Sequence, residues 1–218
     1  MTTLRAQPAL VRHRSPIVGP LLRIVLPVAM PIILLFGGSI ALKRLSHQAD
    51  HDLLAAIDAC DPVATARALD GGADIEGLVP EGYTPLMFAA GAGNRHVVEQ
   101  LIERGAHVNA RTPAGWDALL VAASNGHSEI VELLIRRGAD PNSASDTGLS
   151  PLLAAAQSGH FETIHVLLRS GADANHADAA GRTALSLALE NQHEEAARIL
   201  TPVTRAADPV HSAALTAP

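Results

Sequence analysis

The side chains best suited to chemistry in this sequence are eleven histidines and a single cysteine, Cys60. Three of the histidines, His127, His160 and His193, recur at intervals of 33 residues. Each therefore belongs to a different copy of one pattern, whereas the ligands of a metal ion must converge on one point. His160 and His165 are five residues apart, which suits two ligands on one helix face poorly. We therefore expect the regularly spaced histidines to be structural and predict no metal site.

Other catalytic patterns are missing from the sequence. It has no cysteine pair, His-Glu-x-x-His motif, glycine-rich phosphate loop or nucleophile elbow. Cys60 could act as a redox thiol, but no second cysteine is present to resolve its oxidised form. We expect Cys60 to be a small buried residue instead. The sequence thus predicts a protein that is not an enzyme and has no cofactor and no small-molecule substrate, with a Cys60-dependent redox protein as the alternative.

Charge is distributed unevenly along the chain. All 22 acidic residues follow residue 44, whereas six of the 16 basic residues lie at or before it. Residues 1–44 therefore carry +6, and the ten remaining basic residues leave residues 45–218 at −12. An acidic body is unsuited to binding phosphate backbones, so we exclude nucleic acid as a partner.

A period of 33 residues organises most of the sequence, and such a period is typical of stacked-repeat proteins. Two sets of glycines keep this spacing: Gly82, Gly115, Gly148 and Gly181, and then Gly105, Gly138 and Gly171. Two residues after each glycine of the first set stands a side chain that can cap a helix: Thr84, Asp117, Ser150 or Thr183. These first helices should end near Gly93, Gly126 and Gly159. Second helices with an apolar stripe should follow and end at the second set of glycines.

These segments resemble ankyrin repeats. The resemblance rests on Tyr83-Thr84-Pro85-Leu86, Gly126-His127, Gly159-His160, Gly138-Ala139-Asp140-Pro141-Asn142 and Gly171-Ala172-Asp173-Ala174-Asn175. It implies an all-α solenoid of about five helix pairs over residues 49–203, with repeats at about 49–78, 79–111, 112–144, 145–177 and 178–203. The family often has His after Thr-Pro-Leu. Here we expect apolar contacts at the same positions, which hold Met87, Leu120, Leu153 and, as a polar exception, Ser186.

The segment before the repeats predicts a membrane helix. Residues 24–42 carry no charge and approach the roughly 20 apolar residues that span a bilayer. Residues 1–23 form a basic leader, 43–48 a linker and 204–218 a disordered tail. Four arginines precede the span and two basic residues follow it, which places the repeats outside the cytoplasm, in the periplasm of a bacterium. A secreted form cleaved near Ala41, a cytoplasm-facing adaptor and a buried core helix are the alternatives.

The resemblance also implies where a partner binds, because ankyrin turns and first helices line a concave face. One column at 33-residue intervals holds Tyr83, Trp116, Leu149 and Arg182, and we predict that it anchors a protein partner. A polar rim is predicted at Arg111, Pro113, Asp146 and Asp178. The alternative is that Tyr83 and Trp116 only cover repeat junctions. The chain looks like exported bacterial ankyrin proteins, some of which accompany periplasmic catalases, and this implies a scaffold tethered to the inner membrane that supports an envelope or oxidative-stress protein.

Overall fold

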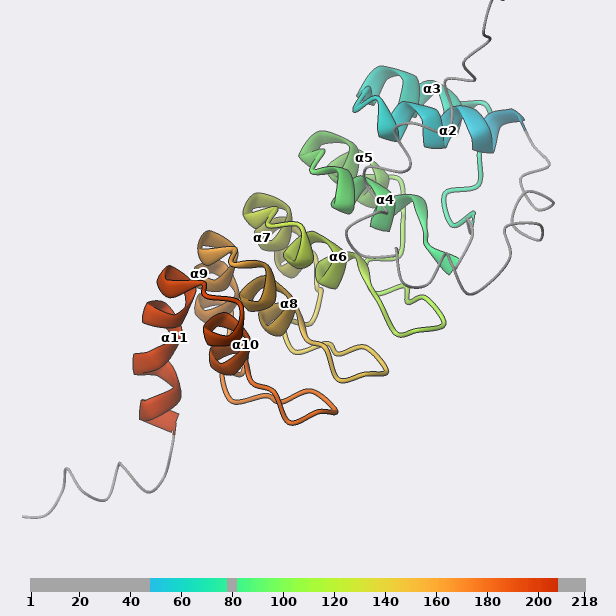
Figure 1. The fold of residues 1–218 in the computed structure, drawn as a ribbon. Helices are drawn as coiled ribbons and strands as arrows, with labels where there is room; N and C mark the ends of the chain where they lie inside the picture. Colours follow the sequence, from blue (N-terminus) through green and yellow to red (C-terminus); the bar gives the residue numbers. More distant parts are fainter. Residues whose placement is uncertain (1–47, 78–81, 208–218) are drawn as a thin grey trace, which may run out of the picture.

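The computed structural model describes residues 48–77 and 82–207, and this part of the chain is helical, as predicted. It contains an isolated bridge between Ala177 and Thr183 but no strand. The helices follow one another in pairs (Figure 1): α2 (Gln48–Asp58) and α3 (Pro62–Asp70), α4 (Pro85–Ala92) and α5 (Arg95–Glu103), α6 (Ala118–Ser124) and α7 (Ser128–Arg136), α8 (Pro151–Ser158) and α9 (Phe161–Arg169), and α10 (Ala184–Glu190) and α11 (Glu194–Ala207).

The helix pairs stack into two layers. The first helices α2, α4, α6, α8 and α10 contact one another in sequence order and form the inner layer. The second helices α3, α5, α7, α9 and α11 form the outer layer in the same order (Figure 1). Because each pair makes its main contacts with its neighbours, the described chain is a linear solenoid of five helix pairs.

Polar side chains begin four of the inner helices as the sequence predicts. In each of them a side-chain oxygen accepts a hydrogen bond from the backbone N–H three residues later, which satisfies a donor that has no partner within the helix. The acceptors Thr84, Asp117, Ser150 and Thr183 pair with the N–H groups of Met87, Leu120, Leu153 and Ser186, at N···O distances of 3.3, 2.8, 3.4 and 3.3 Å.

Alanine and leucine make the core. Consecutive alanines on the inner helices are fully buried, namely Ala89 and Ala90, Ala122 and Ala123, and Ala155 and Ala156. Their small side chains let adjacent helices approach closely. Met87, Leu120 and Leu153 are also buried, so apolar contacts occupy the positions where the resemblance led us to look for His. Ser186 differs, because its hydroxyl accepts a 3.0 Å hydrogen bond from the N–H of Thr183 and completes a capping box.

The ends of the array are close to their predicted positions. The helix α2 begins at Gln48, and α11 continues through Pro202 to Ala207, past the predicted end of the array at residue 203. The predicted leader, the span at 24–42 and residues 208–218 lie outside the described residues. Among the residues that are described, every helix is too short or too polar to cross a bilayer.

Two features explain why glycine is required where the inner helices end. The backbone of Gly126 has φ = 78°, in the left-handed region that glycine adopts at little cost. In addition, a methyl group at Gly126 would lie 2.5 Å from Nδ1 of His160, whose ring covers this glycine from the next repeat. Gly93 and Gly159 have the same relation to His127 and His193.

The terminal repeats lack glycine at this position and keep its left-handed backbone. Cys60 has φ = 54° and Gln192 has φ = 62°. Cys60 is exposed, so the expectation that it is buried is wrong. The physical reason is its place in the turn after α2: in the later repeats a histidine of the next repeat covers this position, whereas the next repeat has Asn94 there.

We predict that Gly126→Ala destabilises the fold more than Gly138→Ala does. Gly138 also has a positive φ of 95°, but a methyl group there would meet no atom within 4 Å. The control should therefore cost only the backbone strain of about 1–2 kcal/mol. The clash with His160 should add about 1–3 kcal/mol at Gly126. Urea unfolding of the two variants measures this difference, and equal losses of stability would contradict the packing role of His160.

Candidate partner-binding surface

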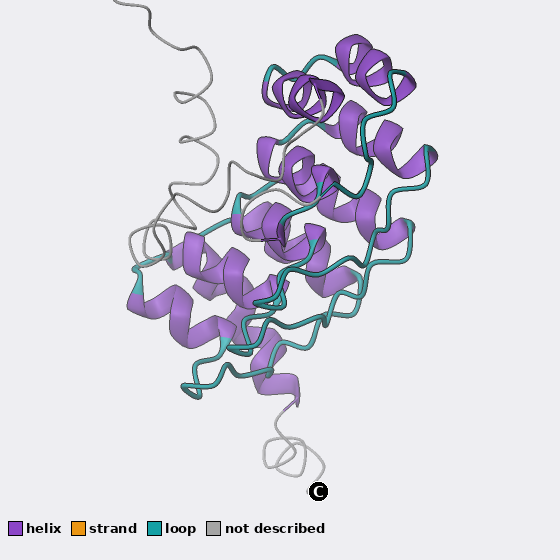
Figure 2. Cartoon of the chain, turned by 90° about the vertical axis from the view of Figure 1, so that its right-hand side faces the viewer, coloured by secondary structure: helices purple, strands orange, loops and turns teal. Residues whose placement is uncertain are grey.

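Among the loops that are described from end to end, three hairpins join the outer helix of one repeat to the inner helix of the next. We call them fingers and define them as residues 111–116, 144–149 and 177–182. They project side by side from the edge of the inner layer (Figures 1 and 2). All of the predicted partner-binding residues except Tyr83 lie in one of the three fingers.

Each finger is closed by the same backbone hydrogen bonds. In the first, the N–H of Gly115 donates to O of Thr112 and the N–H of Thr112 donates to O of Trp116, both at 2.8 Å. Gly115 needs its positive φ of 79° to make this tight turn. The equivalent bonds join Ser145 with Gly148 and Leu149, and Asp178 with Gly181 and Arg182.

A buried polar side chain reinforces each finger. Two of the three, Thr112 and Ser145, were not predicted from the sequence. Thr112 Oγ1 accepts from the N–H of Trp116 at 3.0 Å, and Ser145 Oγ accepts from the N–H of Leu149 at 3.1 Å. Asp178 Oδ1 does the same for Arg182 at 2.9 Å. Their 33-residue spacing, three positions before each glycine, was the signal that could have revealed them.

Hydrogen bonds between fingers hold them in a row. The N–H of Asp146 donates to O of Ala114 at 3.1 Å, and the N–H of Ala179 donates to O of Thr147 at 3.0 Å. The guanidinium of Arg111 donates to O of Gly115 in its own finger and to O of Ala144 in the next. Nε and Nη2 of Arg111 are therefore bonded inside the array, while the residue itself is exposed.

The other predicted rim residues divide into two kinds. Asp178 is buried, and its Oδ2 accepts from Nε and Nη2 of Arg182 at 2.8 and 2.7 Å. The hydrogen bonds from the Arg182 side chain and backbone lower the pKa of Asp178 below its ordinary value of 3.8. This pair is thus satisfied within one finger. Pro113 and Asp146 are exposed, although Pro113 lies beside Gly82 and Asp146 beside Gly115.

The predicted column is partly buried. Tyr83, Trp116 and Leu149 are half-buried and pack against the core, whereas Arg182 is exposed. Packing at repeat junctions therefore accounts for part of the burial of Tyr83 and Trp116. This agrees in part with the alternative interpretation, in which the two side chains only cover these junctions. Phe88 of α4 lies beside this column and was not predicted from the sequence. Its ring centroid lies 5.8 Å from that of Tyr83, in a tilted arrangement typical of aromatic pairs.

Charge separates the two layers in the three central repeats, whereas the inner helices α2 and α10 at the ends carry acidic residues. The inner helices α4, α6 and α8 carry no charged residue. The outer helices α5, α7 and α9 carry between three and four ionisable side chains each, some of which pair across repeats, as Arg95 does with Glu129 and Arg137 with Glu99. The residues of α6 and α8 that are not buried, Ser124, Gln157 and Ser158, therefore offer hydroxyl and amide groups only.

The regularly spaced histidines join neighbouring repeats. Nε2 of His127, His160 and His193 lies 3.0, 3.2 and 3.1 Å from a carbonyl oxygen of the preceding repeat, at Gly91, Ser124 and Gln157 respectively. The structural role that we expected is confirmed by these contacts. In the part of the chain that the structure describes, His, Cys, Asp and Glu side chains do not gather in groups of three that could hold a metal ion.

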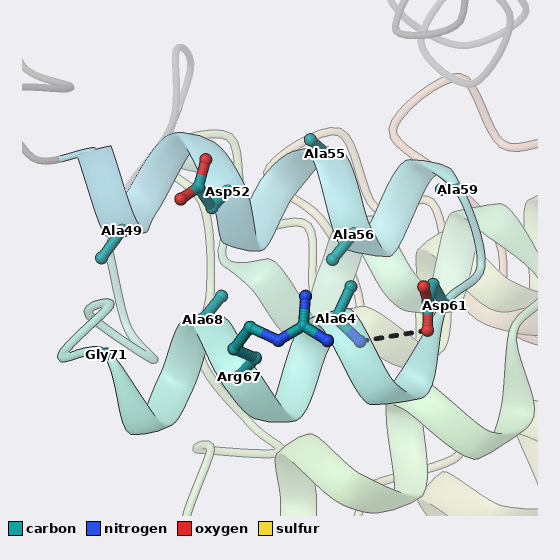
Figure 3. Close-up of a pocket in the computed structure, with 10 residues that line it drawn as sticks. All are labelled: Ala49, Asp52, Ala55, Ala56, Ala59, Asp61, Ala64, Arg67, Ala68 and Gly71. Atoms are coloured by element: carbon teal, nitrogen blue, oxygen red, sulfur yellow. Dashed lines mark hydrogen bonds between the residues drawn. The ribbon is translucent and has the colours of Figure 1, made fainter.

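A shallow groove of about 490 Å³ lies between α2 and α3 at the first repeat (Figure 3). Arg67 reaches along it, and Asp61 caps α3 by accepting from the N–H of Ala64. The groove is lined mainly by small residues: Ala49, Ala55, Ala56, Ala59, Ala64, Ala68 and Gly71, together with Asp52. It lies apart from the fingers, on the side of α2 and α3 that the α4–α5 pair does not cover.

Helix pairs stacked through alanine, with capped inner helices and a row of hairpin fingers, define a helical repeat solenoid. A family model described as ankyrin repeats in three copies matches residues 53–145 and also residues 119–212, so the chain belongs to the ankyrin repeat family. Ankyrin repeats indicate a scaffold for protein–protein interaction. No curated protein matches the chain in sequence.

We predict that His160, one of the regularly spaced histidines, makes the fold sensitive to acid. Burial lowers the pKa of His160 below its ordinary value of 6.5, the bond to Ser124 opposes this, and nearby His127 and His193 add to the lowering. The unfolded chain therefore binds a proton at higher pH than the folded chain does. The stability due to neutral His160 is complete above pH 6.5 and is lost as the pH falls from 6.5 toward the lower folded pKa.

His160→Gln removes the titrating group and keeps a side-chain donor for Ser124. We expect its unfolding free energy to fall less than that of the unmodified chain between about pH 8 and about pH 5. His165→Gln, at an exposed site on α9, is the matched control and should behave like the unmodified chain. Identical pH profiles for the two variants, measured by urea unfolding, would refute the role of His160.

Proposed function

We propose that this chain is a non-catalytic scaffold that binds an uncharged segment of a protein partner. The segment lies along the fingers and across α4, α6 and α8. The observation that carries this proposal is the absence of charge on these three inner helices, next to three half-buried aromatic side chains, Tyr83, Phe88 and Trp116.

The chemistry of the surface defines the kind of partner. The aromatic side chains lie toward the first repeats and offer apolar contact. Toward the later repeats the inner helices present hydroxyl and amide groups, including half-buried Ser124 and exposed Gln157 and Ser158. A charged partner side chain would lose water here without gaining an ionic partner, which is costly. An aliphatic or aromatic anchor with uncharged flanks fits both regions.

The polar groups of the fingers support the same conclusion. Asp178 and Arg182 pair with each other and Arg111 donates to backbone carbonyls, so these residues fix the positions of the fingers, although the Arg111 side chain stays exposed. Of the predicted rim residues, Asp146 keeps an exposed carboxylate. We therefore place recognition on Trp116, Tyr83 and Phe88, and we assign a positioning role to the charged residues.

We predict that Trp116→Ala and Phe88→Ala each weaken partner binding. The loss expected for a hot-spot side chain is about thirtyfold, which corresponds to about 2 kcal/mol. The full chain serves as bait for affinity capture from the membranes of the native host, and each captured protein is then titrated against the purified variants.

Phe161→Ala is the matched control, because Phe161 is an exposed aromatic residue on the outer helix α9. It should leave binding unchanged, and circular dichroism should verify that all three variants are folded. If the Phe161 variant binds as weakly as the Trp116 and Phe88 variants, or if none of the three loses a partner, the inner surface is not the binding site.

We further propose that residues 24–42 tether the scaffold to the inner membrane of a bacterium, with the repeats in the periplasm. The uncharged length of this segment and the excess of basic residues before it support the proposal. An envelope protein is then the expected partner. A periplasmic catalase is the first one to test, since the chain looks like exported ankyrin proteins that accompany such enzymes.

Fusions placed after Pro218 test this arrangement. We predict that alkaline phosphatase is active and green fluorescent protein dark in the fusions, because only the former matures outside the cytoplasm. Deletion of residues 24–42 should reverse both signals, and it serves as the control. Fluorescence from the undeleted chain would instead establish a cytoplasm-facing adaptor, and release of the fusion into the soluble periplasmic fraction would establish cleavage near Ala41.

A further inference from the structure

Each inner helix contributes one residue near its C-terminal end to a column that runs along the array. The members are 33 residues apart: Asp58, Gly91, Ser124, Gln157 and Glu190. The inner helices lie side by side in sequence order (Figure 1), so equivalent positions follow one another along the inner layer. The column is therefore acidic at its two ends and uncharged over the three repeats between them. We call Asp58 and Glu190 the end carboxylates.

The stability of the helices does not explain the end carboxylates. Asp58 is the last residue of α2, and Glu190 is the last residue of α10. The C-terminus of a helix carries the negative end of the helix dipole, so a cation stabilises it and a carboxylate does not. Lysine or arginine would close the ends of the array with a polar surface at least as well. The sign of these two charges therefore points to a contact outside the helices.

The described residues leave one negative charge at each end of the column. Asp58 is half-buried, and its side chain has no hydrogen bond or ion pair with another described residue. Burial raises the pKa of Asp58 above its ordinary value of 3.8, because the carboxylate loses water. Glu190 is exposed and its charge raises the pKa of Arg182, but Arg182 already pairs with Asp178 at 2.7 Å. One cation and two carboxylates leave a single negative charge there.

The strip of inner-helix surface between the end carboxylates is narrow. On α8 the residues that are not buried are Gln157 and Ser158, and on α6 Ser124 is the residue that is not buried. A helix with its side chains is about 10–12 Å wide. An extended chain, which needs less width, fits this strip better than a helix does.

The packing distance of the helices sets the length of such a segment. Four contacts between successive inner helices lead from α2 to α10. Packed helices lie about 8–10 Å apart, so the end carboxylates are separated by about 32–40 Å. An extended chain advances about 3.3 Å per residue and covers this distance in roughly 10–12 residues.

We propose that the partner segment carries a lysine or arginine at each end of an uncharged stretch of roughly 10–12 residues. One cation pairs with Asp58 and the other with Glu190, while the stretch between them crosses α4, α6 and α8. This inference rests on the proposed function, because it specifies the two ends of the segment that binds there. The charge of −12 on residues 45–218 favours the same partner, since it attracts a basic segment and speeds its association.

Selection from a random peptide library tests the proposal without a known partner. The peptides are displayed on phage and have roughly 16 residues, enough to reach both end carboxylates. They are selected on the purified full chain, and the enriched peptides are synthesised. We expect two basic positions roughly 10–12 residues apart with uncharged residues between them. Enriched peptides without this pair of basic residues, or no enrichment at all, would overturn the proposal.

Neutral variants then locate the contacts on the chain. Asp58→Asn and Glu190→Gln should each weaken the binding of an enriched peptide about fivefold, the effect of losing one ion pair. Glu162→Gln removes the same charge from an exposed site on the outer helix α9 and is the matched control. It should leave the affinity unchanged. Equal losses in all three variants would show that only the net charge of the chain matters, and the pairing would be wrong.

A charge exchange guards against variants that merely fold poorly. Two further peptides each have one of the two basic residues replaced by glutamate. Glu190→Lys should bind one of them more tightly than the original peptide, with an unchanged circular dichroism spectrum. Preference for the original peptide would contradict the pairing at Glu190.

Trp116→Ala separates this inference from the proposed function. Peptides whose affinity depends neither on Trp116 nor on the end carboxylates bind elsewhere, which contradicts both proposals. Peptides that depend on Trp116 but not on the end carboxylates contradict this inference alone.

Discussion

The architecture depends on one constraint: a single helix pair is too thin to bury the apolar side chains that it carries on both sides. Every pair must therefore press against another, and the closeness of that contact is set by alanines at equivalent positions of the inner helices, which are fully buried in three consecutive repeats. Larger side chains there would force the helices apart. The same requirement explains why the contacts of each pair are with its immediate neighbours and why the described chain is elongated rather than round.

Stacking also supplies hydrogen-bond partners for the polar backbone groups of the loops. A tight hairpin leaves backbone groups without partners, and the fingers satisfy them with Thr112, Ser145 and Asp178 inside each finger and with Arg111 between two fingers. Each histidine of the column similarly reaches a carbonyl of the repeat before it. Polar residues that look available for binding are thus largely committed to holding the array. What remains for a partner on the inner side is mainly aromatic, hydroxyl and amide surface.

The two ends of the solenoid meet the same constraint differently. At the first repeat the uncovered side is a groove lined by alanines, whose small area limits the cost of exposure. At the last repeat the uncovered side carries leucine, isoleucine and valine, with a larger apolar area. The cap residues differ as well, because Cys60 and Gln192 tolerate a left-handed backbone that glycine provides in the repeats between them. The larger uncovered apolar area of the described chain therefore lies at the C-terminal end of the array.

The sequence by itself determined the repeat, its helices and their start and stop signals, because these are local: a capping oxygen needs an N–H three residues away, and glycine at a fixed spacing needs only its own backbone freedom. It also singled out the column of Tyr83, Trp116, Leu149 and Arg182 as equivalent positions. Burial and pairing were decided only by the tertiary structure, because they depend on which neighbour lies across the stack. The sequence could not show that Asp178 is buried and paired with Arg182, that Arg111 bridges two fingers, that Phe88 joins Tyr83, or that Cys60 lies exposed in the turn after α2.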